Sequence, residues 1–187
     1  MTTLKSICGG SQIAQLSKSA QDIASLDGEV WECGVYQGGT AALLHDLLSD
    51  KIFRLFDTFG PGIPLTGPGD HFHPGMFPID DKTYQDILAH FAPYPNVMLH
   101  KGIIPDTFAG LENSKICFAH IDVDAGQTYT ACLDFIWPRL VNKGIMVFDD
   151  YASCDCLAAT AVVDEFVKVN NIELHLTPGW GGWIQKH

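Results

Sequence analysis

Four aspartates of this chain lie directly after two apolar segments, at positions where buried strands would end. Asp122 and Asp124 follow one segment, and Asp149 and Asp150 follow the other. In open α/β sheets the ligand crevice lies at the carboxyl ends of the strands, so we expect the four side chains to meet there. Carboxylates this close raise one another's pKa and oppose folding unless a cation or shared protons neutralise them. The pattern indicates a metal site.

A glycine-rich turn is the second feature that can do chemistry. Gly34, Gly38 and Gly39 stand between a short strand that opens at Gly28 and a helix that begins near Thr40. Glycines permit close approach of the backbone to a ligand, and a helix start offers unpaired N–H donors to an anionic group. The turn therefore fits a nucleotide-like cofactor. Its spacing differs from the Gly-x-Gly-x-x-Gly pattern of dinucleotide-binding proteins, which disfavours a dehydrogenase.

Elements that could position these residues alternate along the chain. Apolar residues at helical spacing predict an N-terminal helical segment within residues 1–27. The following alternation of strands and helices indicates parallel βαβ units covered on both faces. Residues 173–177 and 183–185 flank a Gly-rich turn and predict a closing antiparallel hairpin. Between the N-terminal helical segment and this hairpin we expect helix 40–48, strand 52–56, helix 82–92, strand 96–100, strand 115–121, helix 127–140, strand 144–148 and helix 156–169.

One long irregular segment, residues 60–81, is dense in Pro and Gly and carries Asp70, His71 and His73. Connections of this length often serve as lids or binding loops, so we expect it to cover the crevice. The two histidines can contact the substrate or, with Asp70, bind a transition metal. Because a mobile loop makes a poor metal cage, we favour a substrate-contacting or structural role.

Composition restricts the class of protein. The 187 residues are 47% hydrophobic, which predicts a single domain, 1–187. Acidic residues outnumber Lys and Arg by 22 to 11, and the net charge of −11 disfavours nucleic acid and anionic membranes as partners. The chain shows no secretory signal and no run of about 18 apolar residues, so we expect a cytoplasmic protein. The sequence leaves open whether it forms a homo-oligomer.

The six cysteines do not form the spaced pairs of a zinc ribbon. Cys33 and Cys117 lie in apolar runs and are expected to be buried strand thiols. Cys154 and Cys156 can bind a soft metal, but a pair near a helix start more often packs in the core. We favour packing.

Five segments occur in an order that resembles the macrocin O-methyltransferase family of class I, S-adenosylmethionine-dependent, metal-assisted enzymes. They are ECGVYQGGT (32–40), FDTFG (56–60), HKGIIPDTF (100–108), HIDVD (120–124) and WPRLVNKGIMVFDDY (137–151). The resemblance extends from Gly28 to the C-terminus. It implies a Rossmann-like class I methyltransferase fold: a mostly parallel seven-stranded sheet with helices on both faces and a C-terminal antiparallel hairpin.

The resemblance also implies roles at the cofactor. The glycines would pass close to its methionine part, Thr40 would lie near its carboxylate, and Asp57 would accept from the ribose hydroxyls. Asp57 can instead be a simple turn residue, but its position after the second strand favours the ribose. The residues implied to bind S-adenosylmethionine are Glu32, Gly34, Gly38, Gly39, Thr40, Asp57, Thr58 and Gly102.

At the reacting centre, the resemblance implies Mg²⁺ held by Asp122, Asp149 and Asp150, with Asp122 also counted as catalytic and Asp124 as general base. Several alternatives stay open. Asp149 and Asp150 can cap the following helix, and Asp124 can be a fourth ligand or a helix N-cap. Glu32 can hold the glycine turn through backbone N–H groups instead of touching cofactor.

His120 can support Asp122 or be a core histidine, and we favour the core.

A departure from the family pattern follows Asp124. Members usually continue with Leu-Tyr, whereas this chain has Ala125-Gly126, which removes a bulky aromatic beside the reacting centre. A different or smaller acceptor is therefore expected.

These features predict a Mg²⁺-assisted, S-adenosylmethionine-dependent O-methyltransferase. Its partner would be a small hydroxylated acceptor, sugar-like or with vicinal diol or catechol character. Two alternatives are a metal-dependent hydrolase of a phosphorylated small molecule, using Asp70, His71 and His73, and a noncatalytic S-adenosylmethionine-binding domain.

Overall fold

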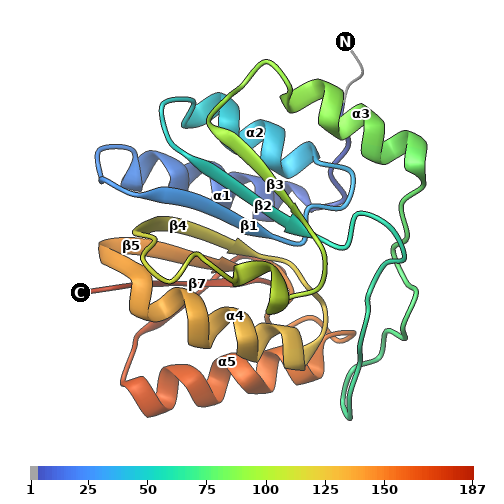
Figure 1. The fold of residues 1–187 in the computed structure, drawn as a ribbon. Coiled ribbons are helices and arrows are strands. Elements are labelled where there is room, and N and C mark those ends of the chain that lie inside the picture. Colours follow the sequence, from blue (N-terminus) through green and yellow to red (C-terminus); the bar gives the residue numbers. More distant parts are fainter. Residues whose placement is uncertain (1–3) are drawn as a thin grey trace.

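A seven-stranded sheet forms the centre of the computed structural model, which describes residues 4–187 (Figure 1). The strand order is β3-β2-β1-β4-β5-β7-β6; the first five are parallel, and β7 is antiparallel to β5 and β6. The expected Rossmann-like sheet and closing hairpin are confirmed. The strands are β1 Glu29–Cys33, β2 Phe53–Asp57, β3 Val97–Lys101, β4 Ile116–Ile121, β5 Leu140–Phe148, β6 Leu174–Leu176 and β7 Gly182–Gln185.

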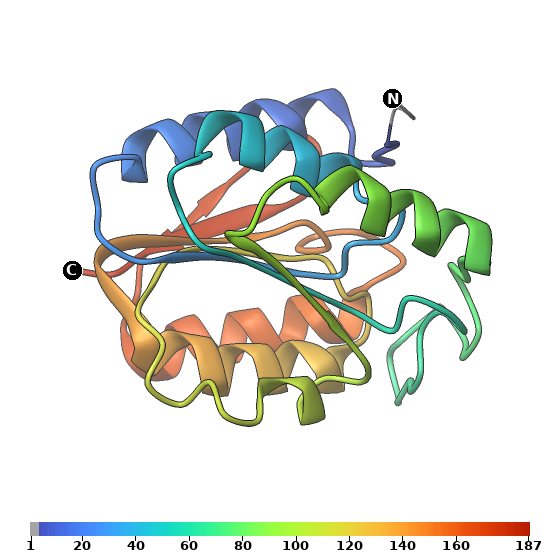
Figure 2. The same ribbon diagram turned by 45° about the horizontal axis from the view of Figure 1, so that its top comes forward.

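Helices cover both faces of this sheet, as Figure 2 shows. On one face lie α1 Gly10–Ile23, α2 Gly39–Leu47 and α3 Asp81–Phe91, and on the other lie α4 Gly126–Arg139 and α5 Leu157–Asn170 with the short 3₁₀ helix η1 Asp106–Phe108. Most elements begin or end within a few residues of the expected positions. The strand expected at 144–148 instead begins at Leu140, because Leu140 already pairs with Ile116 of β4.

Two apolar cores result, one on each face of the sheet. Alternate residues of a strand point to opposite faces, so Val30 of β1 joins the core under α1, α2 and α3, whereas Trp31 joins the core under α4 and α5. Burial on both faces explains the nearly continuous apolar runs of the strands. Cys33 and Cys117 are fully buried, as expected. None of the helices within residues 4–187 combines the length and apolar character needed to cross a membrane.

The connection between β2 and α3 is the long irregular segment. It turns back on itself, since Ile63 N donates to Met76 O and Gly75 N donates to Ile63 O, both at 2.9 Å. Near the N-terminus, an extended segment before α1 lies against the glycine turn, where Lys5 and Gly38 form an isolated β-bridge. Both segments therefore reach the carboxyl ends of the parallel strands.

Candidate active site

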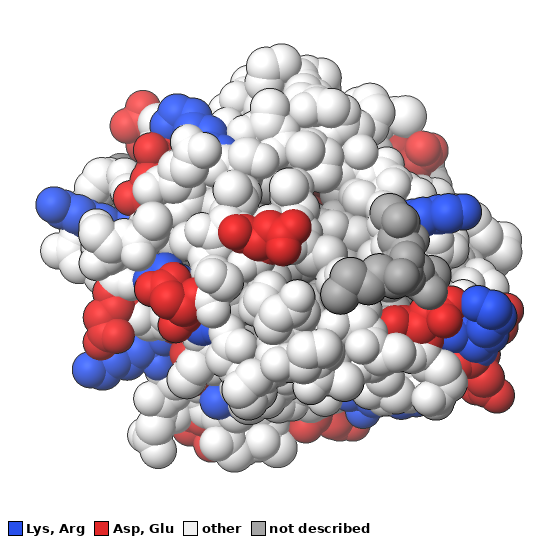
Figure 3. All heavy atoms as spheres, turned by 90° about the horizontal axis from the view of Figure 1, so that it is seen from above, with Lys and Arg blue, Asp and Glu red and all other residues white. Residues whose placement is uncertain are grey.

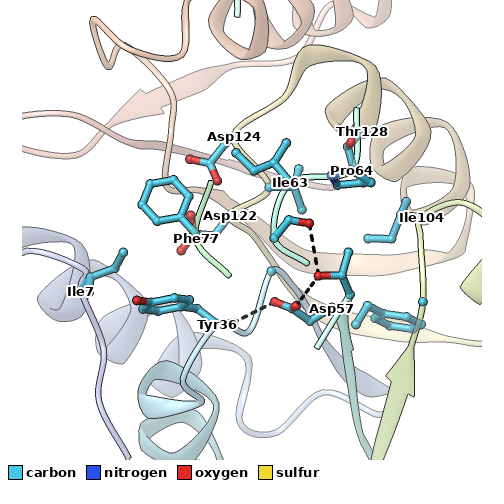
Figure 4. A pocket seen from close by; sticks show the side chains of 16 residues that line it. Ile7, Tyr36, Asp57, Ile63, Pro64, Phe77, Ile104, Asp122, Asp124 and Thr128 are labelled. Atoms are coloured by element: carbon cyan, nitrogen blue, oxygen red, sulfur yellow. Dashed lines mark hydrogen bonds between the residues drawn. The ribbon is translucent and has the colours of Figure 1, made fainter. Parts of the chain in front are cut away.

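A pocket lies where the parallel strands end (Figure 4). The turns after β1, β2 and β3 each supply part of its wall, and the residues after β4 supply two carboxylates. Residues 58–80, named the lid segment after their predicted role, add Ile63, Pro64 and Phe77 to the pocket wall. That this segment covers the crevice as a lid stays a prediction. Of the residues predicted to bind cofactor or react, those that line the pocket are Gly34, Asp57, Thr58, Gly102, Asp122 and Asp124.

The glycine turn touches the residue that follows β4. Gly34 has φ +87°, and a Cβ placed on it would lie 1.7 Å from the carbonyl oxygen of Asp122. No side chain fits at this position, because the turn passes directly against the backbone of the neighbouring strand. The close approach joins the glycine turn to the acidic side of the pocket.

Asp57 holds the same turn in place. Its Oδ2 accepts from the backbone N–H groups of Val35 and Tyr36, both at 2.9 Å, and its Oδ1 accepts from Phe59 N at 2.7 Å. The Thr58 hydroxyl adds a longer bond of 3.3 Å. Asp57 therefore positions the glycine turn from inside the pocket, and its binding of ribose stays a prediction.

Gly38, Gly39 and Thr40 do not line the pocket, because the N-terminal segment lies against them. Gly39 N donates to Lys5 O at 3.0 Å, and a Cβ on Gly39 would lie 2.2 Å from the Lys5 carbonyl carbon. The hydroxyls of Thr40 and Ser6 are 2.8 Å apart. Sequence reasoning did not anticipate this contact, because the short extended segment has no periodic pattern.

Glu32 and His120 form a buried pair behind the acidic residues. Glu32 is 1% exposed and His120 is fully buried, with Glu32 Oε1 3.0 Å from His120 Nδ1. Burial raises the pKa of Glu32. Burial also opposes the charged form of His120, but the hydrogen bond and charge of Glu32 outweigh it and raise the pKa of His120. Glu32 thus bonds the imidazole, and no bond joins it to the described backbone of the glycine turn.

The four aspartates converge, but in two neighbouring groups of ligand atoms, each with all its atoms within 4.8 Å of one another. One group joins Asp122 and Asp149 to Cys8 and His120. The other joins Asp124 and Asp150 to Cys156. The three predicted Mg²⁺ ligands are therefore divided between the two groups.

Hydrogen bonds fix Asp150 within its group. Its Oδ2 accepts from Asp124 N at 2.9 Å, and its Oδ1 accepts from the Cys156 thiol at 3.4 Å. Cys156 is buried, as the packing interpretation of this pair expects, whereas Cys154 is exposed and does not pack in the core. Neither Asp149 nor Asp150 caps α5, whose N-cap is Cys156.

Burial and mutual repulsion raise the pKa values of the acidic cluster. Burial, then Asp149 and Asp150, raise the pKa of Asp122 well above its usual range. Burial and the same neighbours raise the pKa of Asp124 to about 8. Burial raises the pKa of Asp150 to about 6 although Asp124 N donates to it. Without a cation, the cluster holds protons near neutral pH.

Asp124 is aimed into the pocket by an unusual backbone conformation, with φ +60°. It is not the N-cap of α4, since that position is Ala125. The first N–H of α4, from Gly126, instead donates to Asp70 Oδ1 at 3.0 Å, and Asp70 Oδ2 accepts from Gly67 N at 2.8 Å. Asp70 therefore fastens the lid segment to the start of α4.

This arrangement leaves Asp70, His71 and His73 without a shared metal site among the residues that the structure describes. Both histidines are outside the core, and His71 Nδ1 lies 4.0 Å from Asp155. The hydrolase interpretation, which needs these three residues together, therefore finds no support in their placement.

The Ala125-Gly126 departure has a packing reason. A Cβ on Gly126 would lie 2.9 Å from Ala158 Cβ and 3.1 Å from the Ala158 carbonyl carbon. The start of α4 therefore packs too closely against α5 for a side chain such as tyrosine.

The strand order, the terminal antiparallel hairpin and an acid-lined pocket at the strand ends define the class: this is the Rossmann-like fold of class I methyltransferases. The family described as Macrocin-O-methyltransferase (TylF) matches residues 3–178, and the chain belongs to this family.

A curated relative from Streptomyces olivaceus, named 8-demethyl-8-(2,3-dimethoxy-alpha-L-rhamnosyl)-tetracenomycin-C 4'-O-methyltransferase, is 26% identical over 147 residues. The match covers 69% of this chain and 55% of the relative, so the chain spans about half the length of that protein.

Two solved structures share the fold. The O-methyltransferase NovP superimposes with a TM-score of 0.80 at 20% identity, over 95% of this chain and 80% of NovP. An O-methyltransferase from Bacillus cereus, described in complex with SAH (S-adenosylhomocysteine), gives a TM-score of 0.62 at 12% identity, over 95% and 80% of the two chains.

Proposed function

We propose that this protein is an S-adenosylmethionine-dependent, Mg²⁺-assisted O-methyltransferase that acts on a hydroxyl of a sugar-like, vicinal-diol or catechol-like small molecule. Family membership and the name of the Streptomyces relative support methyl transfer to oxygen. The SAH complex of a protein with the same fold supports the cofactor. One observation carries the proposal: Gly34 and Asp57 of the cofactor side line the same pocket as the Asp124 carboxylate.

The reaction is an in-line displacement at the methyl carbon of a sulfonium. The acceptor oxygen forms its bond to carbon as the sulfur–carbon bond breaks, and the acceptor proton must go to a base. Asp124 is the candidate base, because its carboxylate faces the pocket and its pKa of about 8 lies near an ordinary operating pH. The products are a methyl ether, S-adenosylhomocysteine and a protonated Asp124.

Alignment of the two reactants is the other requirement. Holding reactants in line can contribute roughly 7–11 kcal/mol to lowering a barrier. Here Ile63, Pro64 and Phe77 of the lid segment line the pocket together with Asp122 and Asp124 (Figure 4). The lid would thus hold the acceptor against the acidic side of the pocket.

The acidic cluster fits a divalent cation. Asp122 and Asp149 belong to one group of ligand atoms, and Asp149 Oδ1 is buried without a hydrogen-bond partner. Both oxygens of the third predicted ligand, Asp150, already accept hydrogen bonds, so Asp122 and Asp149 are the ligands that the arrangement favours. A bound cation would supply orientation of the acceptor oxygens and a lower pKa for the hydroxyl it touches.

The test is methyl transfer from labelled S-adenosylmethionine to a panel of glycosides, vicinal diols and catechols. We expect turnover with at least one class, lost by about 100-fold or more in Asp124→Asn because general bases typically contribute 10²–10⁴-fold. Binding of S-adenosylhomocysteine, measured by calorimetry, should be unchanged in this variant. Asp22→Asn, which changes an exposed acid on α1, is the matched control and should keep full activity.

Three results would contradict the proposal in different ways. Cofactor binding without turnover on the whole panel would favour the noncatalytic domain. Phosphatase turnover without S-adenosylmethionine would favour the hydrolase. Full activity of Asp124→Asn would remove that residue from the mechanism while leaving the reaction intact.

A further inference from the structure

The Cys8 thiol and the His120 imidazole lie close to two of the carboxylates predicted to bind a metal. The ligand atoms of Cys8, His120, Asp122 and Asp149 all lie within 4.8 Å of one another. Cys8 comes from the segment before α1 and His120 from β4, so neither belongs to the aspartate pairs. The Cys8 sulfur is 3.8 Å from Asp122 Oδ2. Nitrogen, sulfur and oxygen donors therefore surround one point.

His120 is oriented toward this point by its other nitrogen. Nδ1 faces Glu32 Oε1 at 3.0 Å, and the fully buried Nε2 has no hydrogen-bond partner. Asp149 Oδ1 is buried and unpartnered as well. Buried polar atoms nearly always have partners, so two such atoms on members of one cluster of ligand residues indicate a missing ligand. Histidines that bind a metal through one ring nitrogen usually hydrogen-bond a carboxylate through the other, which fixes the orientation of the ring. His120 and Glu32 have this arrangement.

We propose that Cys8, His120, Asp122 and Asp149 bind a transition-metal ion of the Zn²⁺ or Co²⁺ type in preference to Mg²⁺. Mg²⁺ is bound by oxygen ligands in an octahedron, whereas thiolate and imidazole select zinc-like ions. Bonds of about 2.0–2.3 Å to a tetrahedral ion place ligand atoms about 3.3–3.8 Å apart, which the Cys8 to Asp122 distance matches. The inference rests on the cation site of the proposed function and replaces Mg²⁺ there with a transition-metal ion; it revises the metal of that proposal and does not require methyl transfer.

The N-terminal segment is held so that it can deliver the thiol. Gly39 N binds Lys5 O, and the Ser6 hydroxyl contacts the Thr40 hydroxyl, which also lies 3.6 Å from the Cys8 sulfur. Metal binding would release the thiol proton to solvent and link this segment to β4 and β5.

The experiment titrates chelator-treated, dialysed protein with Co²⁺ alone and records absorption. We expect visible bands of a tetrahedral ion and a near-ultraviolet thiolate-to-cobalt band, both of which persist in excess Mg²⁺. Cys8→Ser should lose the thiolate band, and Glu32→Gln should weaken Co²⁺ binding by about 10–100-fold. Cys154→Ser, which changes an exposed cysteine, is the matched control and should keep both signals.

The proposal is overturned if the wild type shows no thiolate band, if Cys8→Ser keeps it, or if Mg²⁺ displaces Co²⁺. Should Cys8→Ser fail to fold, alkylation of the wild type decides: Zn²⁺ must slow the reaction of Cys8 and leave that of Cys154 unchanged. Because absorption needs no methyl acceptor, loss of the proposed function would leave this result standing, and a negative cobalt result would leave methyl transfer untouched.

Discussion

Single residues decide how closely the two sides of the pocket approach. Gly34 is the clearest case, because the atom that a side chain would meet is a backbone carbonyl and cannot move aside easily. Its positive φ adds strain for any other residue. Gly60 lies at the start of the lid segment and differs on both counts, since a Cβ there would meet nothing nearer than Thr58 O at 3.7 Å.

We therefore expect Gly34→Ala to destabilise the fold by about 3 kcal/mol, because overpacking and backbone strain add. Gly60→Ala should be nearly neutral. Urea unfolding followed by circular dichroism measures both. Equal midpoints for the two variants would show that β1 and β4 separate freely at this position.

At the scale of elements, backbone and side-chain hydrogen bonds attach the lid segment to the rest of the fold, with Ala158 N donating to Gly69 O at 3.3 Å and His71 N to Asp155 O at 3.4 Å. Within the segment, Ile63 N donates a hydrogen bond to Met76 O. The Asp70 carboxylate joins the segment to α4, because it accepts from the first N–H of that helix. This bond acts as a helix cap supplied from a distant part of the chain. The same carboxylate closes the turn at Gly67, so one side chain sets the shape of the lid and its position.

Replacing Asp70 with Ala should cost about 1 kcal/mol, the usual cost of a lost helix cap, and should loosen the lid. We expect faster proteolytic cleavage within residues 60–80 under native conditions, detected by mass spectrometry. The control Asp22→Ala removes an exposed acid on α1, away from the lid segment, and should leave the cleavage rate unchanged. A lid that stays equally resistant in Asp70→Ala would show that its apolar contacts hold it closed.

For the whole molecule, excess negative charge is concentrated at the site as well as spread over the surface. The chain carries a net charge of −11. On the face shown in Figure 3, Lys and Arg stand among acidic side chains, and the residues drawn there form no continuous basic surface. Within the pocket, carboxylates repel one another, so binding a cation and folding are linked through the same groups.

Cation-free protein should lose stability as pH rises toward 8. Folded Asp124 has a pKa of about 8, whereas an unfolded aspartate titrates near about 3.9, so the folded state holds more protons between these values. Comparing urea midpoints in chelator at about pH 5.5 and about pH 8 gives the loss, which Asp124→Asn should reduce. A divalent cation should reduce it too. An identical pH dependence in wild type and Asp124→Asn would contradict the raised pKa.

The sequence determined the fold and the general location of the site. Continuous apolar runs predicted strands buried on both faces, and Asp122, Asp124, Asp149 and Asp150 had to converge because parallel strands end at one edge. Gly34 likewise stood out, since only glycine permits such a close approach. These features follow from patterns within short segments and from the rule that parallel strands end at one edge of a sheet.

Only the tertiary structure decided which partners these residues have. It separated Asp150 from Asp122, brought Cys8 beside His120, laid the N-terminal segment over Gly39, and turned Asp70 from a possible ligand into a cap for α4. Each of these contacts joins parts of the chain that are distant in sequence. Their formation depends on how helices, strands and loops pack together, which the order of residues along one segment does not reveal.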